Sequence, residues 1–408
     1  RGQIDDIIGK VKDYLAIENP KKVKVRAGVI EVRNGDFSFY DAGYNAVITG
    51  EKVSGEVLLG DVPKMKIDIK NLISNIKDFP EFRCEMRGTL LFNKDGIHIK
   101  NITLKSYASE MQAEGFYSAE GKGALKADLN LIVDSVKKVF GLKREGEGRI
   151  SAKGDIKFGE GPPVIDIRLK GSFYLQTLME LLKVEERVEG MVDFDGKMSG
   201  AITNITGSAD ARLRRGNLFN VDIDDLRCKV SYRDGIMNFK DGKGVLYNGR
   251  AEAEAAIELP DVEHYSVRVK FTDVDSPAAF KLIEWEPGIP LGKVKGELYS
   301  SDTEFNPAGW FEYENKKTGS DFPGRIRKMK GNFAVQGDIL SLINAEARTE
   351  NSTLGINGAV NMSASLLNLK GKLATVDIAD LTAPYLNRMK GSGDFTGTIT
   401  GNFDDPLI

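Results

Sequence analysis

The chain has 408 residues, of which 57 are basic and 60 are acidic, and its formal net charge is -3. This near-neutral balance excludes the broad basic surface that general binding of a nucleic-acid backbone requires. Hydrophobic residues make up 41% of the chain, aromatic residues only 8%, and 44 glycines are present, a composition that favours a turn-rich β protein over a helix bundle.

Alternating apolar residues begin near the N-terminus, in VKVRAGVIEVRNGDFSFYD (23–41), and continue in RGTLLFNKDGIHIKNITLKS (87–106). A period of two places one apolar face and one wet face on a strand. Asn34-Gly35 and Asp95-Gly96 are dipeptides suited to tight hairpins. The chain begins at Arg1 and has no apolar run of about 18 residues, so we expect no signal peptide or membrane span in it and interpret it as a fragment.

The stretch from Phe219 to Leu259 is strand after strand, joined by Asp-Gly and Asn-Gly turns. Its apolar residues step by two, and the side chains between them are mostly charged. The step slips near Asp224-Asp225, which predicts a β-bulge that bends the strand without exchanging its two faces. The same pattern recurs to the C-terminus, where GSGDFTG (391–397) reads as a hairpin rather than a phosphate-binding loop.

Short amphipathic segments interrupt the strands and predict single helices at irregular intervals. Ser276 followed by Pro277 is a good helix start. The predicted helices lie at 71–79, 134–142, 174–184, 276–285 and 378–386. We expect one elongated, repeat-built protein over 1–408, with possible unit breaks near 77–83, 141–147, 184–189, 287–293 and 306–324, the last of which reads as an extended loop.

The sequence contains no recognisable reaction or metal motif. His98 and His264 have no Cys or carboxylate at ligand spacing, and DFDGK (193–197) lacks the ligands of a calcium loop and reads as a turn. Asp222, Asp224 and Asp225 read as a solvated face rather than a metal site. Cys84 and Cys228 are interpreted as separate thiols. We therefore expect no catalytic residue, no metal and no cofactor, and a protein that is not an enzyme.

Strands that restart at glycine, and the closing MKGSGDFTGTITGNFDDPLI (389–408), resemble the AsmA-like superfamily, and within it most of all the TamB family. ITGSADARLRRGNLFNVDIDDLRCKVSYRDG (205–235) is similar to the repeats of that family. The resemblance implies a mostly β fold, in which a long antiparallel sheet is curled lengthwise into an apolar-lined groove (a β-taco) with short helices between repeat units. It also implies the periplasm of a Gram-negative bacterium and an inner-membrane anchor outside this fragment.

What the resemblance implies about function is a bridge-like conduit that shields the acyl chains of phospholipids between the inner and outer membranes, without catalytic residues. One chain of ~16 carbons in water costs on the order of 10 kcal/mol, which an apolar track offsets. The alternative is a scaffold for outer-membrane protein assembly with a barrel partner, which would bind nascent strands by edge pairing. The predicted groove-lining residues are Val23, Val25, Ile97, Ile99, Leu125, Leu129, Leu131, Ile165, Ile167, Leu169, Val221, Ile223, Val230, Tyr232, Met237, Phe239, Ile257, Val267, Val269, Phe271, Phe333 and Val335. The predicted headgroup contacts are Arg325, Arg327, Lys328 and Lys330.

Two other architectures share parts of this pattern. Sheets packed face to face in a sandwich have the same period of two, although an aromatic content of 8% offers few bulky residues for several such cores. A β-helix enzyme acting on polysaccharides would need a strict repeat of 20 to 25 residues and clustered acid/base groups. Neither feature is present in the sequence.

Overall fold

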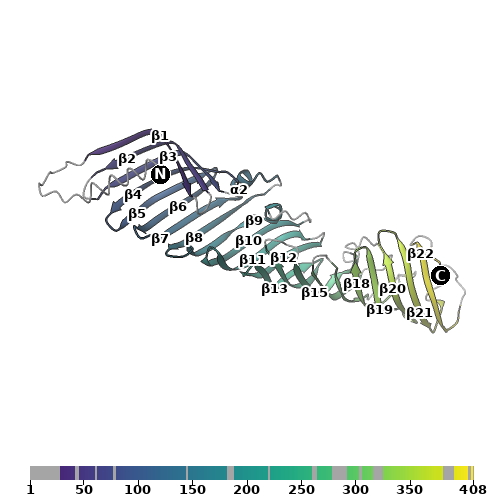
Figure 1. The fold of residues 1–408 in the computed structure, drawn as a ribbon. Helices are drawn as coiled ribbons and strands as arrows, with labels where there is room; N and C mark the ends of the chain where they lie inside the picture. Colours follow the sequence, from purple (N-terminus) through teal and green to yellow (C-terminus); the bar gives the residue numbers. More distant parts are fainter. Residues whose placement is uncertain are drawn as a thin grey trace. The chain divides into compact units, whose positions relative to one another are not determined.

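The computed structural model is almost entirely β-sheet (Figure 1). It describes residues 28–41, 46–59, 62–76, 80–143, 146–181, 188–218, 221–259, 264–277, 292–302, 306–315, 325–379, 390–402 and 406–407. In this part of the chain 23 strands belong to a single sheet, accompanied by two short helices. The expectation of a mostly β fold built on one large antiparallel sheet is therefore confirmed.

The chain divides into two compact units, which are described separately below. Unit 1 comprises Arg1–Phe173 and Gly196–Ile205. Its sheet is a meander in which each strand from β1 to β9 pairs antiparallel with the next. The elements are β1 (Val29–Asp41), β2 (Ala46–Leu58), β3 (Lys64–Ile76), β4 (Phe82–Asn93), β5 (Gly96–Ser106), β6 (Ser109–Ser118), β7 (Gly123–Ile132), α2 (Val133–Phe140), β8 (Gly148–Phe158) and β9 (Val164–Tyr174).

Unit 2 comprises Tyr174–Asp195 and Thr206–Ile408. From β11 onward its strands form a second antiparallel meander. The elements are α3 (Leu175–Leu181), β10 (Val188–Ala201), β11 (Asn204–Leu218), β12 (Val221–Arg233), β13 (Ile236–Leu246), β14 (Gly249–Glu258), β15 (Tyr265–Asp275), β16 (Lys293–Asp302), β17 (Ala308–Glu314), β18 (Lys328–Gln336), β19 (Ile339–Arg348), β20 (Ser352–Asn361), β21 (Leu366–Thr375), β22 (Gly393–Asn402) and β23 (Pro406–Leu407).

Tight turns formed by short polar residues and glycine keep consecutive strands adjacent. Between β12 and β13, Asp234 and Gly235 both have positive φ, of 51° and 80°, as the mirror-image hairpin turns require. Between β4 and β5, the Asn93 Oδ1 atom accepts hydrogen bonds from the backbone N–H groups of Asp95 and Gly96. The hairpins predicted at these Asp-Gly pairs are confirmed.

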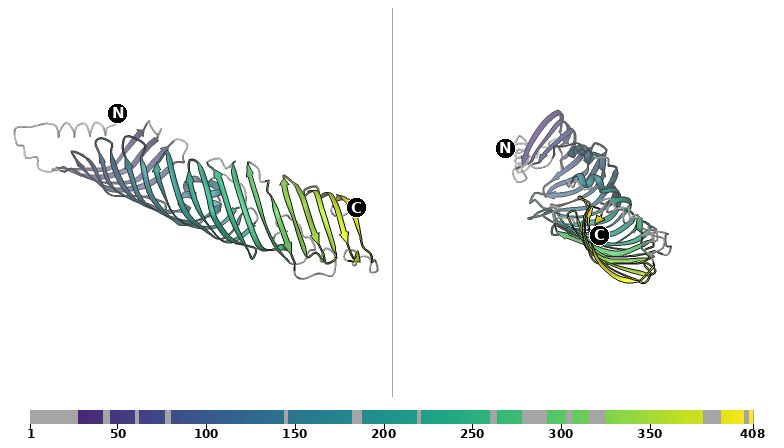
Figure 2. Two further views of the ribbon diagram at one scale, coloured as in Figure 1. Left: turned by 90° about the horizontal axis from the view of Figure 1, so that it is seen from below. Right: turned by 90° about the vertical axis from the view of Figure 1, so that its right-hand side faces the viewer.

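Bulges occur in the middle of many strands, at an Asn or Asp residue with left-handed backbone. In β12 the register shifts between Asp224 and Arg227, where Asp225 has a φ of 48°, so the predicted bulge is confirmed. Equivalent residues in other strands are Asn101, Asp241, Asp273 and Asn344. A bulge bends its strand and increases the local twist, and the strands of both units are visibly curved (Figure 2).

Asn34-Gly35 forms one of these bulges rather than the predicted hairpin. Both residues lie inside β1, which continues to Asp41, and the register with β2 shifts on either side of Gly35. The prediction was wrong because the left-handed backbone that Asn and Gly tolerate serves a bulge as well as a turn. Only the length of strand that pairs on both sides distinguishes the two.

Some of the fully buried apolar side chains lie beside these bends. Val274 follows the Asp273 bulge, is 1% exposed, and forms a cluster with Leu246 and Ala251. A second cluster contains Tyr313, which is 2% exposed, with Val294, Ile326 and Ala347.

The predicted helices have mixed outcomes. The predicted helices at 134–142 and 174–184 correspond to α2, which begins one residue earlier, and to α3. The helix predicted at 71–79 was wrong as far as Ile76, because these residues continue β3, and 77–79 lie outside the described residues. There the Ile69–Leu72 register shift interrupts the alternation and imitates a helical spacing. The segments 276–285 and 378–386 fall mostly outside the described residues.

Two other local predictions were wrong. Part of the predicted loop 306–324 is the strand β17, which pairs with both β16 and β18, and residues 316–324 lie outside the described residues. The predicted turn at 193–197 lies inside β10. Both segments contain polar residues and glycine, and this composition suggested a loop or a turn. In the structure, pairing with the neighbouring strands keeps both segments in the sheet.

The conformation at Asn101 gives a direct test of the bulges. Its φ of 51° suits Asn or Gly but places the side chain of a β-branched residue against its own backbone. We expect Asn101→Val to lower the free energy of unfolding by about 1–2 kcal/mol, while Asn101→Gly stays within about 0.5 kcal/mol of the parent. Urea denaturation measures both; equal losses for the two variants would contradict a left-handed requirement at this position.

Candidate functional site

One face of unit 1 carries continuous cross-strand rows of apolar side chains. Residues directly opposite each other in an antiparallel pair project from the same face, so the registers define each row. The first row, from β1 to β9, consists of Ile30, Val57, Met65, Leu90, Ile99, Gly115, Leu125, Ile156 and Ile165. The second, from β2 to β9, consists of Val53, Ile69, Met86, Leu104, Met111, Leu129, Ala152 and Leu169. Neither row contains an ionisable side chain.

Unit 2 has an equivalent face. One row consists of Ala209, Val230, Phe239, Ala255 and Val267. Another continues from β14 to β22 through Ala253, Val269, Leu298, Gly309, Phe333, Leu342, Gly358, Leu369 and Ile399. Glycines between large residues leave room for neighbouring side chains: a Cβ atom on Gly296 would lie 2.7 Å from the Phe271 ring.

We call the surface formed by these rows the apolar face of each unit. Most of its side chains are half-buried rather than buried, Leu129 and Val230 among them. Among the described residues, the elements in extensive contact are strands that follow one another in the chain, together with α2 against β7 and β8. A sandwich would instead bring distant strands into face-to-face contact. The described part of each unit is therefore a single sheet layer without a second sheet packed over its apolar face.

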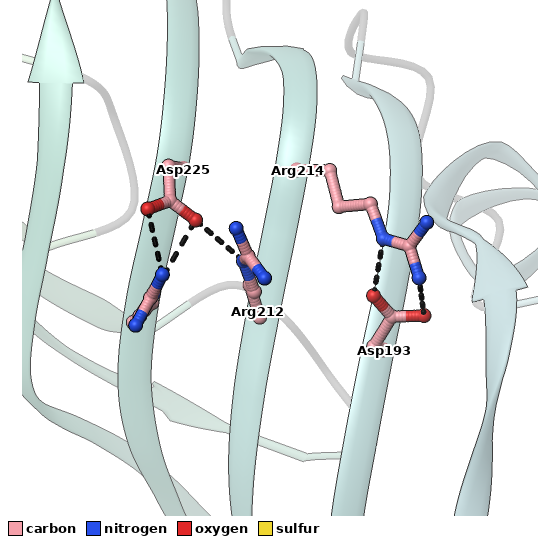
Figure 3. Close-up of polar contacts among 5 residues, drawn as sticks. Asp193, Arg212, Arg214 and Asp225 are labelled. Atoms are coloured by element: carbon pink, nitrogen blue, oxygen red, sulfur yellow. Dashed lines mark hydrogen bonds and ion pairs between the residues drawn. The ribbon is translucent and has the colours of Figure 1, made fainter.

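The opposite, outward face carries ion pairs both within a strand and between neighbouring strands (Figure 3). The Asp225 carboxylate lies 2.9 Å from the Arg227 guanidinium and 2.5 Å from that of Arg212, and Arg214 Nε lies 2.6 Å from Asp193. The hydrogen bonds from Arg227 and then Arg212 lower the pKa of Asp225. Each exposed ion pair contributes little to stability, but the charged side chains make this face of the sheet hydrophilic.

The structure places the predicted groove-lining residues on the apolar face wherever it describes them. Val23 and Val25 lie outside the described residues. Those not yet assigned to a row have apolar or glycine partners across the strands: Ile97 with Tyr117, Leu131 with Ile150, Ile167 with Gly154, Val221 with Leu218, Ile223 with Leu246, Tyr232 with Met237, Met237 with Ile257, Phe271 with Gly296, and Val335 with Leu340. Their role in lining a groove stays a prediction.

Sequence reasoning missed much of this face in β1 to β6, where bulges interrupt the alternation. The spacing of Leu and Met residues on either side of each bulge was the signal that could have identified these members of the apolar face. The missed members are Ile30, Val53, Val57, Met65, Ile69, Met86, Leu90, Leu104 and Met111.

The predicted headgroup-contact residues are spread over a loop and β18, and each has a partner. Arg325 donates a hydrogen bond to the Ala379 carbonyl. Arg327, Lys328 and Lys330 form ion pairs with Glu350, Glu314 and Glu346 respectively, at 3.3, 3.3 and 4.0 Å. These acidic partners compensate the positive charge that the sequence concentrates here.

Reactive groups are dispersed in the described residues, which contain no cluster of three or more His, Cys, Asp or Glu able to hold a metal ion. Asp224 pairs with Arg215 at 3.0 Å and Asp222 accepts a hydrogen bond from Asn217, so these carboxylates do not converge. Cys84 and Cys228 are free thiols. Burial raises the pKa of Cys84 to about 11 and also raises that of Cys228.

A cavity of about 540 Å³ opens in unit 2 where α3 meets the ends of β10, β11 and β12. Its lining is mixed, with Ile223 beside charged side chains that include Glu189 and Arg215. The Arg215 side chain is 88% exposed, so this is a polar surface hollow, distinct in chemistry from the apolar face.

Comparisons with known proteins assign no family to the chain: it matches no family model, no curated protein and no solved structure. Among the described residues no helix has the length and apolar character needed to cross a membrane. The feature to be explained is therefore the apolar face itself.

Proposed function

We propose that the chain is a conduit for lipids, whose acyl chains lie along the apolar face of the curved sheet while the outward face stays in water. The observation that carries this proposal is the pair of uninterrupted, charge-free rows in unit 1 and their equivalents in unit 2. No second layer lies over these rows in the part of the chain that the structure describes. The proposed cargo is phospholipid that moves across the periplasm between the inner and outer membranes.

The chemistry of the face suits a sliding apolar ligand. The side chains of the rows described above are aliphatic, Met, Phe and Gly, with Tyr117 and Tyr232 beside them, and none of these side chains is charged at neutral pH. Each CH₂ removed from water contributes about 0.8 kcal/mol, so a face of this kind offsets most of the cost of extracting an acyl chain. Large exposed apolar surfaces of soluble proteins normally require such a partner.

Native mass spectrometry with lipid extraction tests the proposal on the 408-residue chain expressed in a Gram-negative bacterium and purified without added lipid. We expect bound phospholipid that survives purification and is displaced by detergent. A homogeneous, lipid-free chain that also fails to take up fluorescent phospholipid from vesicles would contradict the conduit. If that lipid-free chain instead cross-links to unfolded outer-membrane proteins, the scaffold alternative replaces it.

A further inference from the structure

A strip of mostly uncharged side chains lies on the outward face of unit 2, between β16 and β21. Elsewhere on this side, ion pairs such as Lys295 with Glu312, at 2.7 Å, link neighbouring strands. The strip begins at Tyr299 of β16, opposite Ala308. It continues as a cross-strand row of small uncharged side chains: Ala308, Ala334, Ser341, Ala359 and Asn368.

Two rows of larger side chains border this row of small ones. On its β18 side Trp310 lies opposite Asn332, which in turn lies opposite Ile343. On its β16 side Trp310 lies opposite Glu297, whose carboxylate pairs with Arg268 at 3.4 Å. The border on the other side consists of Gln336, Ile339, Asn361 and Leu366. The two borders are four positions apart along each strand, or roughly 13 Å. From β16 to β21 the strip extends over roughly 24 Å.

The strip combines solvent-exposed aromatic rings with side-chain amides that make no hydrogen bond to other described residues. Tyr299 is 53% exposed, Trp310 is 38% exposed and Ile343 is 45% exposed, so all three present large apolar groups to water. The side-chain amides of Asn332 and Asn368 are exposed and make no hydrogen bond within the described part of the chain. Tyr299 and Trp310 are diagonal neighbours on paired strands, about 7–8 Å apart in the usual sheet geometry.

We propose that this strip binds a linear, uncharged polysaccharide. A sugar ring has apolar C–H faces, which stack on aromatic rings, and hydroxyl edges, which exchange hydrogen bonds with amides that both donate and accept. Strand faces are known platforms for oligosaccharides and stacked rings. A protein partner fits less well, because interface centres are dense in apolar residues, whereas here Asn332 separates Trp310 from Ile343. This function is independent of lipid binding and uses the opposite face.

Isothermal titration and tryptophan fluorescence of the 408-residue chain, with soluble hexamers of β-1,4-linked glucose and of β-1,4-linked N-acetylglucosamine, test the proposal. We expect saturable binding of at least one hexamer. Trp310→Ala should weaken it by about tenfold and Asn332→Ala by roughly threefold or more, while Trp310→Phe retains most of the affinity. The matched control is Tyr107→Ala, which removes an aromatic side chain that is 62% exposed in a turn of unit 1.

The proposal fails if neither hexamer binds to the folded chain at millimolar concentration. It fails equally if neither hexamer binds and a protein cross-links to the strip instead. It also fails if Tyr107→Ala weakens binding as much as Trp310→Ala does. Asn332→Ala keeps the test decisive if Trp310→Ala does not fold. The amount of phospholipid bound to the apolar face should be unchanged in these outward-face variants. Absence of polysaccharide binding would therefore leave the conduit proposal standing, and absence of bound lipid would leave the polysaccharide proposal standing.

Discussion

Leu129→Asp should abolish the co-purification of phospholipid with the chain while leaving its sheet folded. Leu129 lies in β7 between Met111 and Ala152 on the apolar face and is half-buried. A carboxylate at this position interrupts a charge-free row and would have to lose its water against an acyl chain, at a cost of several kcal/mol. Without lipid the carboxylate stays hydrated, so the free energy of unfolding falls by only about 1–3 kcal/mol.

The matched control is Asn130→Asp, one residue along the same strand, where the side chain is exposed on the outward face. It adds the same charge and should leave lipid content unchanged. Phe239→Arg, with Asn238→Arg as its control, repeats the comparison in unit 2, where Phe239 lies between Val230 and Ala255. Lipid quantified by mass spectrometry, and strand content by circular dichroism, decide the outcome. Folded Leu129→Asp and Phe239→Arg variants with the parent's lipid content would exclude the apolar face as the lipid track.

Tyr313→Ala should lower the free energy of unfolding of unit 2 by about 3–5 kcal/mol. Its ring is among the largest fully buried side chains of the described residues and packs with Val294, Ile326 and Ala347. The ring also lies directly over Gly292, where an added Cβ atom would come within 2.3 Å of it. Truncation therefore leaves a cavity that rigid strands on both sides cannot fill.

Trp310→Ala is the control for Tyr313→Ala, three positions earlier in β17, with its side chain on the outward face and 38% exposed. It should cost less than about 1 kcal/mol. Hydrogen exchange should show faster exchange in β16 to β18 of Tyr313→Ala and unchanged protection in β5 to β7, since among the described residues each strand has its extensive strand contacts with the strands next to it in the chain. Uniform loss of protection along the whole chain would mean that the sheet unfolds as one cooperative block.

The candidate site was predictable to the extent that each strand alternates without interruption. β12 and β15 read correctly because Val230 and Val267 each stand between a serine and a charged residue. β3 did not, since the register shift after Ile69 breaks the alternation and makes the following residues resemble a helix. The outward strip at Trp310 also escaped the sequence, because a strand pattern says which residues share a face of one strand but not which strands lie beside it.

The amino-acid sequence by itself determined the strands, their turns and the two-faced character of the sheet. Period-two alternation and Asp-Gly turns are local properties, and each is set by sterics within a few residues of the chain. Only the tertiary structure decided that bulges at residues such as Asn101 and Asp273 bend the strands, and that no second layer covers the apolar face of the described sheet. A sandwich and a single curved layer share the same alternation, so the choice between them depends on which strands come into contact, and that is a non-local property.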